Sequence, residues 1–92
     1  MFKPLFLKDG RAILRVNKKF YLDKGKQVLD DNGNPQYDLE KTGVVQSTTG
    51  NELKKGAVVL PIIRGGVPIP SEETKKYLTV AIDLEDIYAL EV

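Results

Sequence analysis

The sequence of 92 residues contains no cysteine, no histidine and no tryptophan. Without cysteine the chain can form no disulfide, thiolate metal site or dithiol redox centre. Without histidine it lacks the usual general base at neutral pH, the commonest metal ligand and the usual pH switch. Its two serines, Ser47 and Ser71, therefore have no histidine that could activate them as nucleophiles. We predict that the protein is not an enzyme, has no catalytic residues and holds no metal or cofactor.

The chain also lacks long apolar runs and a strong net charge. Its longest apolar runs are Ala57–Leu60 and Ile62–Ile63, which Pro61 separates, whereas a membrane-spanning helix needs about 20 apolar residues. The first residues lack the apolar stretch and the cleavage site of a secretory signal. The formal net charge is +1, so bulk charge favours neither nucleic acid nor an anionic membrane. We expect a cytoplasmic location, or a virus particle, without a membrane partner.

The charged residues form four blocks of alternating sign along the chain. Net charge is +6 over residues 1–26, −4 over 27–40, +3 over 41–64 and −4 over 65–92. Antiparallel segments that neutralise each other would explain this pattern, and so would a ring whose subunits have one basic and one acidic edge. Local solvated faces that alternate by chance are the third interpretation.

Eight glycines and five prolines divide the chain into short runs that favour strands. In the strand predicted over Arg11–Val16, apolar residues alternate with outward-facing ones. The other predicted strands are Phe20–Leu22, Lys26–Leu29, Tyr37–Leu39, Thr42–Ser47, Gly56–Ile63, Tyr77–Ile82 and Ile87–Glu91. Helical turns are expected only at Ser71–Lys76 and Leu84–Ile87. Many short strands with turns between them predict an all-β fold, a small antiparallel β-barrel that forms one domain over residues 1–92.

The strongest turn signal lies between two apolar runs, at Asn32 and Gly33. This pair supplies the positive φ angles of a type I′ hairpin turn, and Pro35, which has no N–H, favours an edge position. The sequence therefore predicts that a loop or hairpin projects from the barrel at about residues 18–41. Asp30, Asn32 and Asn34 imitate the start of a calcium loop, but Pro35 replaces its required glycine. We therefore expect no calcium site.

The basic first block contains aromatic residues, as do small barrels that bind single-stranded nucleic acid. Two of these aromatics, Phe6 and Phe20, lie in apolar settings that favour a core position. The acids of residues 27–40 would also repel phosphate. The sequence therefore disfavours a nucleic-acid partner.

Three segments, taken in order, resemble the GroES-type co-chaperonins. Lys3-Pro4-Leu5 followed by Asp9–Val16 is similar to the family's basic-Pro-Leu step and its Asp-Arg-β-branched first strand. Thr42–Val45 followed by Leu53–Leu60 is similar to its Gly-x-Val and Val-Gly-Asp-x-Val strands, except that Ala57 replaces the aspartate.

The end of the chain carries the most specific of the three similarities. Lys76–Val80 followed by Leu84–Leu90 is similar to the family's Tyr-Leu-Ile strand, its acid-Asp-Ile turn and its final Leu-Ala-x-Val strand. Only Gln46–Leu53 fills the place of the hairpin that forms the family's dome. The resemblance is therefore to a short variant without a dome, as in some phage-encoded co-chaperonins.

This resemblance implies a non-enzymatic, ring-forming homo-oligomer that binds and caps a chaperonin. In the family, a flexible loop docks on the chaperonin through an Ile-Val-Leu tripeptide. The nearest match here is Gln27, Val28 and Leu29, in which the polar first residue would weaken docking. The basic first strand and the acidic last strand would meet between neighbouring subunits and close a ring. The expected interface residues are Lys3, Leu5, Arg11, Tyr88, Leu90 and Val92.

A second hypothesis belongs to a different class of protein. The same small barrel suits a structural subunit of a larger assembly, such as a head, neck or tail component of a phage virion. Gln27–Tyr37 would then be an ordered arm that docks on a neighbouring subunit. The sequence leaves open whether residues 18–41 form a mobile loop or an ordered hairpin.

Overall fold

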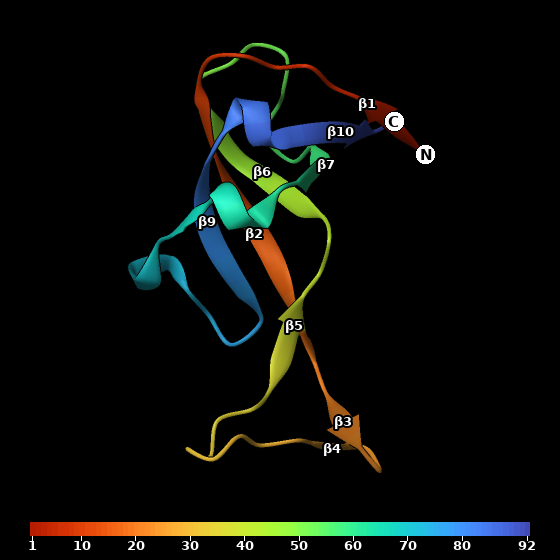
Figure 1. Ribbon diagram of the computed structural model, residues 1–92, viewed down its shortest axis with the longest axis vertical. Helices are drawn as coiled ribbons and strands as arrows, with labels where there is room; N and C mark the ends of the chain where they lie inside the picture. Colours follow the sequence, from red (N-terminus) through yellow and green to blue (C-terminus); the bar gives the residue numbers. More distant parts are fainter.

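The computed structural model describes all of residues 1–92 and has an all-β fold with no α-helix. Its strands are β1 (Phe2–Pro4), β2 (Arg11–Phe20), β3 (Leu22–Asp23), β4 (Lys26–Gln27), β5 (Tyr37–Leu39), β6 (Gly43–Thr48), β7 (Val58–Pro61), β8 (Val67–Pro68), β9 (Tyr77–Asp83) and β10 (Ile87–Glu91) (Figure 1). Three 3₁₀ turns connect them: η1 (Ile63–Gly65), η2 (Pro70–Glu72) and η3 (Leu84–Asp86). The predicted all-β class is therefore confirmed. No helix here has the length and apolar character needed to cross a membrane.

The main sheet is antiparallel and open, with the strand order β1-β10-β7-β6-β2-β9-β8. The sheet does not close into the predicted barrel, because its two edge strands do not pair with each other. Leu5 donates its N–H to the Tyr88 carbonyl on β10, so the backbone nitrogen of the preceding residue, Pro4, points away from the sheet. In the same way Ile69 donates to β9, so Pro68 faces outward from β8. Since proline has no N–H to donate, neither edge supports continued pairing.

The core lies on one face of this sheet, and the central strand β2 contributes most to it. Ala12, Leu14 and Val16 are all buried, as the predicted alternation over Arg11–Val16 requires. Partners on β9 and β6 complete the layer, and η3 covers its end. The buried cluster comprises Ala12, Leu14, Val16, Val45, Leu53, Val59, Val80, Ile82, Leu84 and Ile87.

Strand β2 continues beyond the core and forms one side of a projecting arm, defined here as residues 18–41 (Figure 1). Its last three residues pair with β5, in the register Lys18 with Leu39 and Phe20 with Tyr37. The arm points away from the chain termini, which lie at the other end of the molecule. The long dimension of the protein, 43 Å, reflects this extension.

Two tight turns shape the end of the arm, and the predicted turn type at one of them is wrong. Strands β3 and β4 are joined by Lys24 and Gly25, whose φ angles of 52° and 81° are those of a type I′ turn. The second turn crosses three residues between Asp30 and Asn34, and only Gly33 has a positive φ angle. Asp30 and Asn34 are hydrogen-bonded to each other and enclose a loop of three residues. A hairpin loop of this length is typically a type I turn followed by a bulge at a residue with positive φ, here Gly33.

Candidate functional site

The backbone of the arm is held by hydrogen bonds among three separate segments. Val28 donates its N–H to the Tyr21 carbonyl at 3.0 Å, and Gln36 donates to the Val28 carbonyl at 2.8 Å. Tyr21 in turn donates to the Gln36 carbonyl at 3.0 Å, which closes the triangle. Of the two forms that the sequence leaves open, the structure therefore describes a hydrogen-bonded hairpin.

The acidic turn at the end of the arm is held by its own first residue. Asp30 Oδ1 accepts hydrogen bonds from the backbone N–H groups of Asn32 and Asn34, both at 2.9 Å. This side chain is therefore occupied by the turn itself, in the usual manner of an Asx turn. The neighbouring Asp31 is exposed and forms no ion pair.

The arm exposes large apolar side chains, of which the sequence predicted only some. Gln27 lies exposed on β4, Val28 is half-buried, and the Leu29 residue is 56% exposed. Leu22, on β3, is 64% exposed, and Tyr21 beside it is also exposed. The exposure of Leu22 and Tyr21 on the arm was not predicted. It depends on the type I′ turn at Lys24-Gly25, a pair with only a weak local preference for that turn.

A nearly buried lysine fixes the root of the arm to the loop that follows η2. The Lys18 side chain is only 9% exposed, and its Nζ lies 2.8 Å from Glu73 Oε1 and 2.9 Å from the Thr74 carbonyl oxygen. The same Nζ lies 4.7 Å from the centroid of the Tyr37 ring on β5. This ring packs edge-on against Phe20. One ammonium group therefore connects β2, β5 and the loop after η2.

We expect Lys18→Ala to lower the free energy of unfolding by about 1–3 kcal/mol, because it removes charge-assisted hydrogen bonds and a cation–π contact. Lys19→Ala is the matched control, since Lys19 is exposed on the same strand and should change stability by less than about 0.5 kcal/mol. Urea denaturation of both variants measures the difference. Equal stability of the two variants would contradict the role of Lys18 as a clamp.

A tyrosine and an aspartate join the two sides of the arm further out. The Tyr21 hydroxyl donates a hydrogen bond to Asp38 Oδ2. This hydrogen bond, more than desolvation or the negative charge of Asp38, raises the pKa of the Tyr21 phenol. The phenol therefore stays protonated near neutral pH and acts as a donor that supports the arm.

The predicted interface residues come together at the terminal edge, defined here as β1 and β10. Lys3 pairs with Leu90, Leu5 donates to the Tyr88 carbonyl, and Val92 donates to the Met1 carbonyl. All these pairings lie within one chain, so pairing between subunits stays a prediction. The sixth predicted residue, Arg11, lies apart from this edge and contacts Asp83, with Nε 3.3 Å from Oδ1.

Several large apolar side chains are also exposed near the terminal edge. Those on the paired strands and at the chain ends are Met1, Phe2, Tyr88 and Val92. Phe6 follows β1 and is almost fully exposed, so its predicted core position is wrong. The arm and the terminal edge are thus two separate apolar surfaces at opposite ends of the molecule (Figure 1).

A groove crosses the outer face of β2, opposite the core. It consists of two hollows of about 290 and 460 Å³, which share Ile13 and Ser47 in their linings. The first also contains Ile69, Arg15 and Glu72. The Arg15 guanidinium lies 4.0 Å above the Tyr77 ring and forms no ion pair. The sequence does not reveal this groove, because its lining comes from four segments that are distant along the chain.

No protein-family model matches the chain, and the comparisons with curated proteins and with solved structures found no similar protein. The resemblance to the co-chaperonins therefore stays a prediction. No three acidic side chains lie together in the manner of a metal site. The features that remain for a functional argument are the arm, the terminal edge and the groove on β2.

Proposed function

We propose that this protein is a non-enzymatic subunit of a larger assembly, such as a virion accessory protein, and that its arm docks on a neighbouring subunit. The observation that carries the proposal is an ordered arm with exposed apolar side chains. Leu22 and Leu29 are mostly exposed, yet the backbone beneath them is hydrogen-bonded.

The exposed leucines of the arm add little to the stability of their own chain. Burying a leucine side chain is worth about 1.5–3 kcal/mol, and Leu22 and Leu29 forgo most of that in the free protein. Exposed apolar groups that gather on an ordered element mark contact sites. The Lys18 clamp adds to this argument, because a docking element held in one orientation loses less entropy when it binds.

The double substitution Leu22→Ser/Leu29→Ser tests the proposal. We expect the wild-type chain to migrate in a high-mass complex when extracts of its own source are fractionated by size. The double variant should migrate as the free chain, while its urea midpoint stays close to that of the wild type, because both side chains are exposed.

Val67→Ser is the matched control for this experiment. Val67 is a similarly exposed apolar residue on β8, outside the arm, and its replacement should leave the complex intact. Migration of the wild-type chain as a free monomer would defeat the proposal. Persistence of the complex in the double variant would defeat it equally.

A co-chaperonin-like ring subunit is the second candidate, and the pairing of β1 with β10 favours it. The family resemblance expects Lys3 and Leu90 at a subunit interface, and within one chain these two residues lie opposite each other. A ring would form if β1 left its own β10 and paired with that of the next subunit. The same size fractionation separates the candidates: a complex that contains chaperonin subunits would support the ring, and one without them supports the structural subunit.

A further inference from the structure

The groove on β2 combines an apolar floor with one unpaired cation. Ile13 and Ile69 line the first hollow, and Arg15 is exposed beside them. Arg11, in the second hollow, is already paired with Asp83. Arg15 is therefore the cation of this groove that has no ion-pair partner.

The end of the arm carries the complementary groups in a compact turn. Leu29 presents an apolar side chain, and two residues later Asp31 presents a carboxylate without an ion-pair partner. The turn around them is rigid, because Asp30 accepts two backbone hydrogen bonds. The acidic block of residues 27–40 contains no basic residue that would compete for Asp31.

On the basis of the proposed docking role of the arm, we infer that the arm of one copy of the chain binds in this groove on a second copy. Leu29 of one copy lies on Ile13 and Ile69 of the next, and Asp31 pairs with Arg15. Basic and acidic groups that meet in this way fix the orientation of the two partners.

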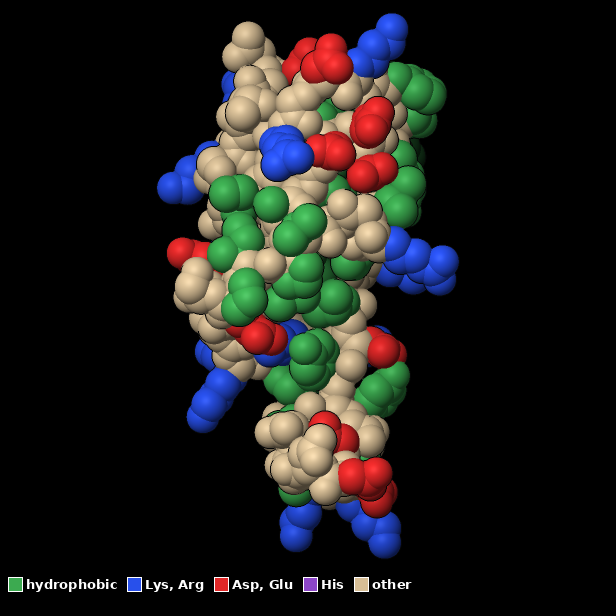
Figure 2. All heavy atoms as spheres, turned by 60° about the vertical axis from the view of Figure 1, so that its left-hand side comes forward, with side chains coloured by type: hydrophobic (Ala, Val, Ile, Leu, Met, Phe, Trp, Pro, Cys, Tyr) green, Lys and Arg blue, Asp and Glu red, His purple; other side chains and the backbone are tan.

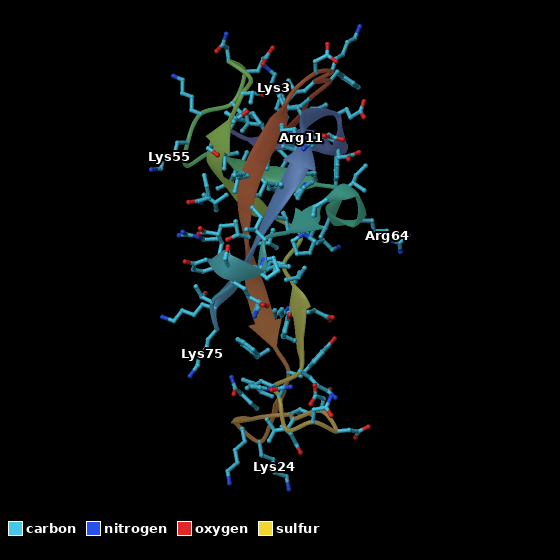
Figure 3. The ribbon with its side chains drawn as sticks, turned by 90° about the vertical axis from the view of Figure 1, so that its left-hand side faces the viewer. Lys3, Arg11, Lys24, Lys55, Arg64 and Lys75 are labelled. Carbon is cyan, nitrogen blue, oxygen red and sulfur yellow. The ribbon has the colours of Figure 1, made fainter.

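The arm cannot fill the groove of its own chain. Ten residues of β2 extend over roughly 30 Å at about 3.3 Å per residue. The groove lies along the early part of this strand, and the arm continues from its end. Figure 3 shows this separation, with Arg11 and Lys24 far apart along the molecule.

The contact joins two different surfaces, so each copy offers both an arm and a groove. Such a heterologous contact produces a ring where the rotation closes and a filament where it does not. A single turn in a groove buries less than the roughly 1,200–2,000 Å² of a stable interface. We therefore expect reversible association that depends on protein concentration. Glu72 lines the same groove and weakens its positive potential, which also favours reversibility.

Sedimentation equilibrium of the purified chain, from about 10 µM to about 1 mM, tests the inference. The average mass of the wild-type protein should rise with concentration. Asp31→Arg and Arg15→Asp should each lower the association constant about tenfold or more, because each places like charges at the contact. The charge-swapped double variant should regain association to within about threefold of wild type.

Two further variants guard against loss of the fold and nonspecific charge effects. Ser47→Tyr fills the middle of the groove from an exposed position and should also abolish association. Asp23→Arg makes the same charge change on β3, away from the turn, and should associate as the wild type does. Circular dichroism and urea denaturation confirm that each variant is folded.

A purified wild-type chain that stays monomeric at the highest concentration would overturn this inference. So would single charge reversals that associate normally, or a double variant that fails to regain association. In each case a high-mass complex in source extracts would leave the proposed function standing, with a different protein or a nucleic acid in the groove. The proposed function is defeated by its own test, when the wild-type chain migrates alone or when the complex persists in the Leu22→Ser/Leu29→Ser variant.

Discussion

Leu14→Ala is expected to lower the free energy of unfolding by about 3–5 kcal/mol. Leu14 is fully buried at the centre of β2, between β6 and β9. A side chain added at Gly43 would lie only 3.2 Å from Leu14 Cδ1, which shows how closely the backbone of β6 approaches. Paired strands on both sides keep this backbone from moving in to fill the cavity. A domain of this length has a total stability of about 5–14 kcal/mol, so much of it would be lost.

Ile13→Ala is the matched control for this prediction. Ile13 is the next residue before Leu14 on the same strand, but it faces the groove and is only half-buried. Its truncation should cost less than half as much as that of Leu14. Guanidinium denaturation of both variants measures the difference. Equal losses would show that the core does not lie on the face assigned to it.

Gly10→Ala is expected to cost about 2–4 kcal/mol, for two reasons that add. The φ angle of Gly10 is +119°, a conformation that L-residues rarely adopt. An added Cβ would also lie 2.7 Å from Thr49 Oγ1 and 2.8 Å from Leu84 Cδ1. Leu84 is buried, and Thr49 Oγ1 accepts the N–H of Arg11, so neither atom can withdraw without loss.

Gly25→Ala separates the two causes. Gly25 also has a positive φ angle, +81°, but no atom lies within 4 Å of a Cβ added there. The substitution should therefore carry only the conformational cost, about 1 kcal/mol. Thermal and urea denaturation of the two variants give the comparison. A Gly10 variant no less stable than the Gly25 variant would contradict the close packing beside η3.

The sequence predicted most of the strands but neither β1 nor β8, and it predicted the arrangement of the strands less well. The alternation over Arg11–Val16 was enough to assign the buried face of β2, because the side-chain period of a strand is local. Closure of the sheet depends on whether two distant edges can pair. Pro4 and Pro68 oppose further pairing because their nitrogens face outward from the two edges. These positions follow from the register of each edge strand.

Turn type shows the same limit on a smaller scale. Asn32-Gly33 has the stronger local preference, yet the type I′ turn forms at Lys24-Gly25. The pairing of Leu22 with Gln27 and of Asp23 with Lys26 leaves two residues for that loop. The pairing of β3 with β4 therefore selects the type I′ turn at Lys24-Gly25, although this dipeptide has a weaker intrinsic preference for that turn than Asn32-Gly33.

The candidate site was predictable only where local sequence determines it. The position of the arm followed from its turn residues and polar flanks. The Lys18 clamp did not, because its partner Glu73 is 55 residues away and Lys18 is one of eight basic residues in its block. Figure 2 shows a comparable case: hydrophobic side chains gather over the middle of one face and run toward the arm. Non-local packing alone brings such residues together.

The continuity of β2 from the core into the arm has a mechanical consequence. A load applied at Phe20, where β2 ends within the arm, passes along this one strand to Val16 and Leu14. Strands β6 and β9 hold this segment on both sides, so pulling along the strand shears many backbone hydrogen bonds at once. If the arm docks on a neighbouring subunit as proposed, β2 would pass tension from the arm to the whole domain.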